Sequence, residues 1–173
     1  MLRTFPRDFR WGVASSGHQT EGGNTRSDTW FLEHVSPTVF REPSGRACDS
    51  YQRWREDLGL VAGMGLDTGA VRYAFAAAGV PVLVTEHGLG HRDDSLRAGF
   101  LEPALAGLLD VIEDGVPVLG YLHWTLLDNF EWIFGYDVRF GLHEVDRETF
   151  TRRAKPSAAV YSAIVRAHGV DGR

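Results

Sequence analysis

The sequence predicts an α/β protein in which a parallel sheet is flanked by helices. Short apolar runs alternate with helical patterns along the chain, and this order implies parallel strands joined by helical crossovers. Three apolar runs are the expected strands, residues 9–14, 80–85 and 116–122. The length of 173 residues favours one domain over residues 1–173 with a sizeable core.

Apolar residues at helical spacing predict four helices. The first follows Asp49 as its N-cap and ends at Gly63 or Gly65; the second covers Ala70 to Ala78. The third has Leu101 and Ile112 on its inner face, with Pro103 at its start or at a kink. Pro156 opens the last, which has Val160, Tyr161, Ile164 and Val165 facing inward. Residues 15–27 and 29–44 read as irregular segments, and residues 141–150 as a hairpin.

Composition excludes several classes of function. The net charge of -5 gives no electrostatic reason to expect nucleic acid or an anionic membrane as a partner. Cys48 is the only cysteine, which excludes an internal disulfide and a cysteine-rich zinc site. No His-Glu ladder has the spacing of metal ligands, so we expect no metal and no other cofactor. No apolar run has the length of a signal peptide or a membrane span, and a cytoplasmic protein is the simplest expectation.

Polar residues follow each predicted strand. In parallel sheets the reactive groups gather at the carboxyl ends of the strands. Those ends are residues 15–22 with Gln19, residues 86–90 with Glu86 and His87, and residues 123–132 with the sequence HWTLLDNFEW. Aromatic faces beside carboxylates and amides suit a sugar, because an indole packs on the apolar face of the ring while the polar groups bind its hydroxyls.

These segments resemble glycoside hydrolase family 1, the β-glucosidases and their relatives. The resemblance covers nearly the whole chain and is carried by FPRDFRWGVASSGHQTEGG, SGRACDSYQRWREDLGLVAGMGL, VLVTEHG, GYLHWTLLDNFEWIFGYDVRFGL and RRAKPSAAVYSAIV. It implies a fold derived from a (β/α)8 barrel, with Glu86 at the nucleophile position. It also implies that Gln19, Trp124, Glu131 and Trp132 bind the sugar, whereas the residues alone leave the two tryptophans equally open to a role in the core. His87 replaces the family's Asn and is expected to contribute hydrogen bonds to the substrate site.

The chain departs from the family in two ways. A complete (β/α)8 barrel needs about 250 residues, and the sequence passes from the family's beginning to its end near residues 66–70. We therefore expect a truncated barrel that keeps the equivalents of the first, seventh and eighth strands. The acid/base of the family is a Glu that follows Asn, but neither Asn24 nor Asn129 precedes a Glu. A retaining glycosidase needs two carboxyl groups, so ordinary hydrolysis should be crippled.

Three functions remain open, and the expected partner is a small hydroxylated substrate. We favour an enzyme that uses Glu86 as a base, alone or with His87, to eliminate water from a metabolite in a biosynthetic pathway. The second is a residual β-glycosidase that borrows an acid from Glu21, Glu131 or another subunit. The third is a sugar-binding or scaffold protein without catalysis.

Two structural expectations accompany these functions. Glu86 should lie at the end of a central strand, buried on both faces, and face a pocket shared with Trp124. Free sheet edges at the first strand and at residues 80–85 favour a homodimer, because barrels exist partly to remove such edges. The inward faces, such as Phe9 and Trp11, should lack their former partners across the barrel, and residues 29–44 are the alternative cover for an edge.

Overall fold

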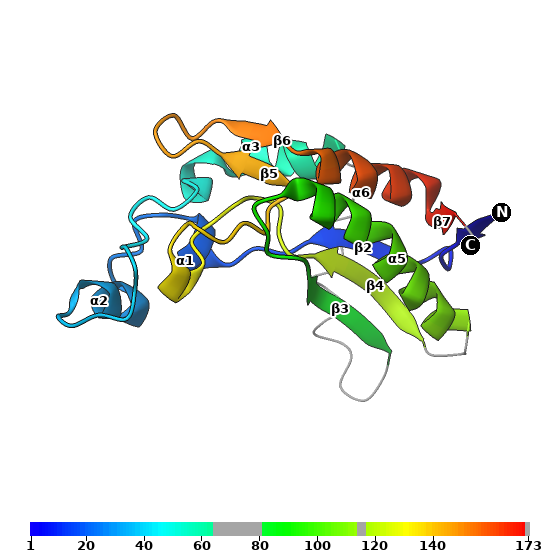
Figure 1. Cartoon of the computed structure of the whole chain (residues 1–173), viewed down its shortest axis with the longest axis horizontal. Coiled ribbons are helices and arrows are strands. Elements are labelled where there is room, and N and C mark those ends of the chain that lie inside the picture. Colours follow the sequence, from blue (N-terminus) through cyan, green and yellow to red (C-terminus); the bar gives the residue numbers. More distant parts are fainter. Residues whose placement is uncertain (64–80, 114–116, 172–173) are drawn as a thin grey trace.

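The structure is a computed structural model, and it describes residues 1–63, 81–113 and 117–171. Within these residues a parallel sheet is combined with helices and with two pairs of short antiparallel strands (Figure 1). The elements in chain order are β1 (Leu2–Thr4), β2 (Arg10–Val13), α1 (Gly17–Thr20), α2 (Asp28–His34), α3 (Ser50–Gly63), β3 (Val82–His87), α5 (Asp94–Glu113), β4 (Val118–His123), η2 (Trp132–Phe134), β5 (His143–Val145), β6 (Arg152–Ala154), α6 (Pro156–Ala167) and β7 (Gly169–Asp171).

The three apolar runs that the sequence singles out form one parallel sheet in the order β2-β4-β3. This confirms the predicted α/β class with parallel strands. His123, the last residue of β4, pairs with Val13 of β2 and with His87 of β3. The three strands therefore end at the same edge, and the segments that follow them emerge side by side.

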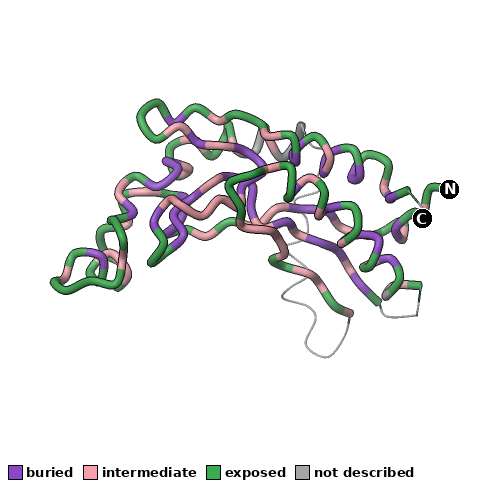
Figure 2. Tube along the Cα trace, viewed as in Figure 1, coloured by how far each residue is buried: buried purple, intermediate pink, exposed green. Residues whose placement is uncertain are grey.

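One face of this sheet is covered by α5 and α6, which Figure 1 shows lying along each other. Trp11 and Tyr121 from the sheet and Leu105 and Tyr161 from the helices belong to one buried core. The Tyr161 hydroxyl also donates to the carbonyl of Gly12 at 2.9 Å, which fixes α6 against β2. Figure 2 shows the buried residues following β2, β4 and the inner sides of these helices.

Strand β3 is an outer strand, so the prediction that it is central and buried on both faces is wrong. Val82 is 51% exposed, and Leu83 and Val84 are half-buried. The prediction for Phe9 and Trp11 is also wrong, since both are at most 5% exposed. These two rings pack against each other, and Trp11 also contacts Tyr161 of α6, so α6 covers this part of the sheet.

Two short helices lie where irregular chain is predicted. Ser27 caps α2, because its hydroxyl accepts a hydrogen bond from the amide of Trp30 at 3.1 Å. Figure 1 places α2 beyond the carboxyl ends of the strands, away from the outer edge of β3, so residues 29–44 do not cover that edge. The predicted helix over residues 70–78 and the deletion joint near residues 66–70 lie outside the described residues.

The end of the chain forms the predicted hairpin and helix. Strands β5 and β6 are antiparallel, and α6 begins at Pro156 as expected. Pro103 lies inside α5 rather than at its start. The antiparallel pairing of β1 with β7, which joins the two ends of the described chain, has no signal in the sequence analysis. None of the helices in the described ranges is both long and apolar enough to cross a membrane.

Candidate functional site

The candidate site lies at the edge where the three parallel strands end. Gln19 comes from α1, directly after β2, and Glu86 is the second-last residue of β3. Trp124 follows the last residue of β4, and the loop after it carries Glu131 and, at the start of η2, Trp132. These residues, and His87 at the end of β3, therefore come from segments that emerge side by side.

Gln19 lies at the base of this group and is only 2% exposed. Its amide nitrogen donates to the Asn129 side chain at 3.1 Å and to Oε2 of Glu131 at 3.4 Å. The Gln19 carbonyl accepts from the amide of Phe130 at 3.3 Å. These bonds join α1 to the loop after β4, so the amide of Gln19 has a fixed direction. Asn129 was absent from the predicted site, although its place in the run DNFEW, two residues before Glu131, could have marked it.

Glu131 is a buried carboxyl group at 8% exposure. Its backbone amide donates to the Gly135 carbonyl at 2.7 Å, which turns the chain around η2. The Trp124 side chain and Gln19 bond to the carboxyl group, while Oε1 has no partner within the described residues. Burial raises the pKa of Glu131 to about 7, and the negative charges of Asp128 and Glu86 add to the increase.

Glu86 therefore lies close enough to Glu131 for its charge to act on that carboxyl group. The pairing of β3 with β4 shifts register between Val84 and His87, so Glu86 lies in an irregular stretch of the strand. Its side chain is exposed to solvent. A ligand can thus reach Glu86 from outside, while Gln19 and Glu131 form the buried floor beside it.

The two tryptophans are not core residues. Trp124 is half-buried, and Trp132 is 39% exposed. Trp132 lies parallel to the ring of His18, with centroids 5.8 Å apart, and His18 bonds through Nε2 to the buried carboxylate of Glu33 at 2.6 Å. The sequence analysis left open a core role for these tryptophans; the structure leaves both indoles with surface available to a sugar ring.

His87 is the predicted site residue that the structure places apart from the others. Its ring turns to α5, where it lies 5.1 Å from the ring of Phe100, and its Nδ1 is 3.0 Å from the Tyr121 hydroxyl. With Ala104 and Leu108 it lines a mostly apolar hollow. Val84 lines the same hollow, so the register shift between Val84 and His87 places these two side chains on one face of the strand.

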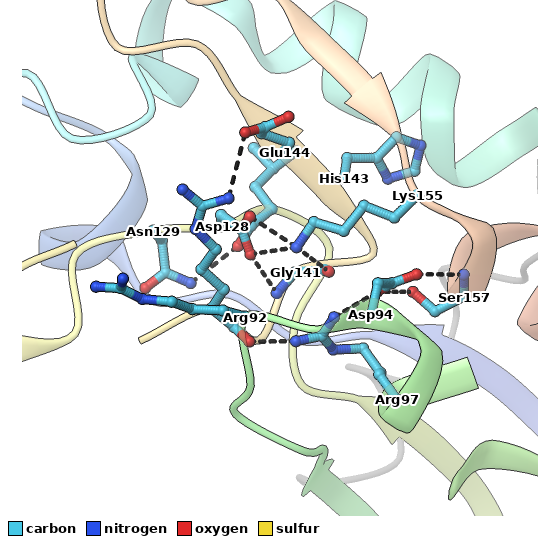
Figure 3. A network of polar contacts seen from close by, with 12 residues as sticks. Arg92, Asp94, Arg97, Asp128, Asn129, Gly141, His143, Glu144, Lys155 and Ser157 are labelled. Atoms are coloured by element: carbon cyan, nitrogen blue, oxygen red, sulfur yellow. Dashed lines mark hydrogen bonds and ion pairs between the residues drawn. The ribbon is translucent and has the colours of Figure 1, made fainter. Parts of the chain in front are cut away.

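A network of charged residues anchors the loops of the site (Figure 3). Lys155 contacts both carboxylate oxygens of Asp128 at 2.7 Å and donates to the Gly141 carbonyl at 2.9 Å. Arg97, whose side chain is fully buried, pairs with Asp94 and donates to backbone carbonyls of residues 89, 91 and 139. Because residues 89 and 91 follow β3 and residue 139 follows β4, one guanidinium group holds the two loops together.

The described residues contain no group of three His, Cys, Asp or Glu that is placed to hold a metal ion. The strand ends carry one exposed and one buried carboxyl group, an amide and two indoles. Carboxyl and amide groups are suited to bind hydroxyls, and an indole is suited to pack on the apolar face of a sugar ring.

Comparison with known proteins points to the same class. The family model of glycosyl hydrolase family 1 matches residues 1–78 and 70–170. A β-galactosidase of Sulfolobus acidocaldarius is 40% identical over 92 residues, which are 53% of this chain and 19% of that protein. The chloroplastic galactolipid galactosyltransferase SFR2 of Arabidopsis thaliana is 42% identical over 88 residues, 50% of this chain and 14% of that protein. The chain thus spans less than a fifth of the length of these relatives.

Solved structures extend the likeness to the fold. The crystal structure of β-glycosidase BGL167 superposes with a TM-score of 0.86 at 20% identity and covers 98% of this chain and 99% of its own. A β-glycosidase of Thermosphaera aggregans superposes with a TM-score of 0.52 at 34% identity, over 66% of this chain and 22% of that one. The match of the family model over nearly the whole sequence is decisive, and the chain belongs to glycosyl hydrolase family 1.

Proposed function

We propose that this protein cleaves β-glycosides, with Glu86 as the nucleophile that attacks the anomeric carbon. The observation that carries the proposal is the grouping of Glu86 with Gln19, Trp124 and Glu131 at one end of the sheet. An exposed carboxylate is free to attack, while the amide and the indole are suited to hold the sugar beside it.

The relatives support this choice. Those named above include a β-galactosidase and a galactosyltransferase, so attack at a sugar's anomeric carbon is common to them. BGL167, which this chain covers almost end to end, is named a β-glycosidase. We infer that β2, β3 and β4 correspond to the first, seventh and eighth strands of the full barrel.

Dehydration by Glu86 is now less well supported than glycoside cleavage. The sequence favours dehydration because it has no Asn-Glu-Pro motif and hence no second carboxyl group of the usual kind. Glu131 is a second carboxyl group at the same end of the sheet, near enough for the charge of Glu86 to raise its pKa. His87, the suggested helper in a dehydration, faces α5 instead. Neither the relatives nor the site favours elimination over glycoside cleavage.

The test is the trapping of a covalent intermediate. A 2,4-dinitrophenyl 2-deoxy-2-fluoro-β-glycoside slows the second step of a retaining reaction, so the sugar should remain on the protein as an ester. We expect mass spectrometry of the intact protein to show one added fluoroglycosyl group, located on the peptide that contains Glu86. Glucose and galactose versions should both be tried, because the relatives include enzymes named for each sugar.

Matched variants make the result specific. Glu86→Gln keeps the size of the side chain and removes its nucleophile, so neither the adduct nor turnover of dinitrophenyl glycosides should appear. Glu144→Gln alters a half-buried glutamate of β5 that pairs with Arg139 and is not one of the predicted site residues, and it should behave as the unmodified protein. Binding of sugar without turnover or adduct would favour the non-catalytic alternative, and loss of water from a β-hydroxycarbonyl compound would favour the dehydratase.

A further inference from the structure

A β-glycosidase of this kind needs a proton donor as well as a nucleophile. Alkoxide and phenoxide leaving groups depart readily only when they are protonated, and retaining enzymes use a second carboxyl group for this. The usual donor motif is missing from the sequence. The donor must therefore come from carboxyl groups near Glu86 if the chain acts by itself.

Two of the nearby acids are unsuited to the task. Asp128 has Lys155 against both of its carboxylate oxygens, and one of them also accepts the amide of Gly141 at 2.9 Å. Its oxygens are thus occupied by an ammonium group and a backbone donor. Glu21 is exposed, and its carboxyl group lies against Gly17 of its own helix. Neither geometry presents a carboxyl proton to a sugar at Glu86.

Glu131 has the opposite properties. Its residue is 8% exposed, and its Oε1 is buried with no hydrogen-bond partner within the described part of the chain. The other oxygen, Oε2, faces the amide of Gln19. The carboxyl group therefore has one oxygen held by Gln19 and one buried oxygen that no described group of the protein occupies.

We propose that Glu131 is the proton donor of this site, a role beyond the sugar binding that the family resemblance implies for it. The proposal rests on the glycosidase function proposed above. Burial and the charges of Asp128 and Glu86 raise the pKa of Glu131 to about 7, so a large fraction of the group is protonated at neutral pH. Glu86, exposed to solvent, is the partner that attacks, and two carboxyl groups in different environments can take the two roles.

The reaction then balances in two steps. A carboxylate oxygen of Glu86 bonds to the anomeric carbon while the bond from that carbon to the leaving oxygen breaks, and the proton of Glu131 passes to the leaving oxygen. The products are a glycosyl ester on Glu86, a free alcohol and ionised Glu131. Water next attacks the anomeric carbon, Glu131 takes a proton from it, and the ester bond breaks to release the sugar and restore both groups.

The experiment measures kcat/KM for β-glucosides whose leaving groups are 2,4-dinitrophenol, 4-nitrophenol and phenol. In Glu131→Gln the value for phenyl glucoside should fall at least about 100-fold, as expected for loss of a general acid. The value for dinitrophenyl glucoside should fall less than about 10-fold, because that group leaves without a proton. Azide, which needs no base in the second step, should raise kcat of this variant on dinitrophenyl glucoside. Glu144→Gln is the control and should keep the behaviour of the unmodified protein.

A second variant tests the assignment without removing the carboxyl group. The side-chain bond from Trp124 lowers the pKa of Glu131, so Trp124→Phe should move the loss of activity at high pH to a higher pH. In Glu131→Gln the same limb of the pH profile should disappear. Circular dichroism and thermal unfolding would establish that each variant is folded.

The possible failures are distinguishable. An equal loss for all three leaving groups in Glu131→Gln, with the high-pH limb retained, would overturn the role as proton donor and leave Glu131 as a sugar ligand. Turnover of dinitrophenyl glucoside that is unaffected by Glu86→Gln, or no turnover of any glycoside by the unmodified protein, would instead overturn the proposed function.

Discussion

The raised pKa of Glu131 makes a prediction about stability that does not depend on any reaction. The ordinary pKa of this carboxyl group is 4.5, and in the folded protein it is about 7. Between these values the folded chain holds a proton that the unfolded chain has released. Unfolding therefore becomes easier as the pH rises through this window, because the folded state must either keep the proton or bury a charge.

The magnitude follows from the two pKa values. Each pKa unit corresponds to about 1.4 kcal/mol, so ionisation of Glu131 should cost on the order of 3 kcal/mol of the free energy of unfolding above about pH 7. This is a large share of the 5–15 kcal/mol that is usual for a domain. Glu131→Gln cannot ionise and should escape this loss. As the pH rises above about 4.5, the free energy of unfolding of the variant should thus increase relative to that of the unmodified protein. Below about pH 4.5 the difference between the two proteins should change little.

The assay is urea unfolding across the range from about pH 4.5 to about pH 8.5, with the difference in free energy of unfolding between the two proteins plotted against pH. Glu144→Gln replaces a glutamate whose side chain is 42% exposed and serves as the control for loss of one carboxyl group. Parallel curves for Glu131→Gln and the unmodified protein would refute the reasoning, since they would mean that Glu131 titrates alike in the folded and unfolded states.

Four further outcomes are expected. Burial lowers the pKa of His123 to about 3, so stability should be lost as the pH falls below 6.5, and His123→Phe should reduce that loss in acid urea titrations. Lys155→Met leaves Asp128 without its cation and should lower the free energy of unfolding, measured in urea, by about 3 kcal/mol. Gly88→Ala would press a methyl group on the backbone just after β4 and should lower turnover strongly, whereas Gly99→Ala, with open space around it, should leave turnover unchanged. We also propose a homodimer through the outer edge of β3: sedimentation equilibrium should give twice 19.2 kDa, and a species of 19.2 kDa would contradict it.

The sequence predicts the parallel sheet because its three strands are short apolar runs separated by helical patterns. The same signal cannot place a strand within the sheet. A run such as Val82 to Val84 looks alike whether one neighbour or two lie beside it, and the structure makes it the outer strand with Val82 half-exposed. Short helices such as α1 and α2 escape periodicity altogether, because four or seven residues complete at most two turns.

The site was predictable where a single side chain follows a strand and obscure where partners come from elsewhere. Glu86 and Trp124 follow from the carboxyl ends of their strands. The hydrogen bond from Gln19 to Asn129 joins residues 110 positions apart, and no local pattern contains it. The orientation of His87 could not have been anticipated, because the register shift between Val84 and His87 interrupts the alternation of the strand. The raised pKa of Glu131 depends on burial that only the folded chain creates.

The positions of the two carboxyl groups are fixed by contacts that the chain contains within itself. In a closed barrel, neighbouring strands on both sides restrain each loop at the active end, whereas β3 here pairs with β4 alone in the part of the chain that is described. The fully buried Arg97 replaces part of that restraint, because its donors reach carbonyls after β3 and after β4 from one position on α5. A buried guanidinium group left with missing acceptors would be costly, so both loops are held where its donors need them. Arg97 on α5 thus ties the segment that follows Glu86 to the loop that follows β4.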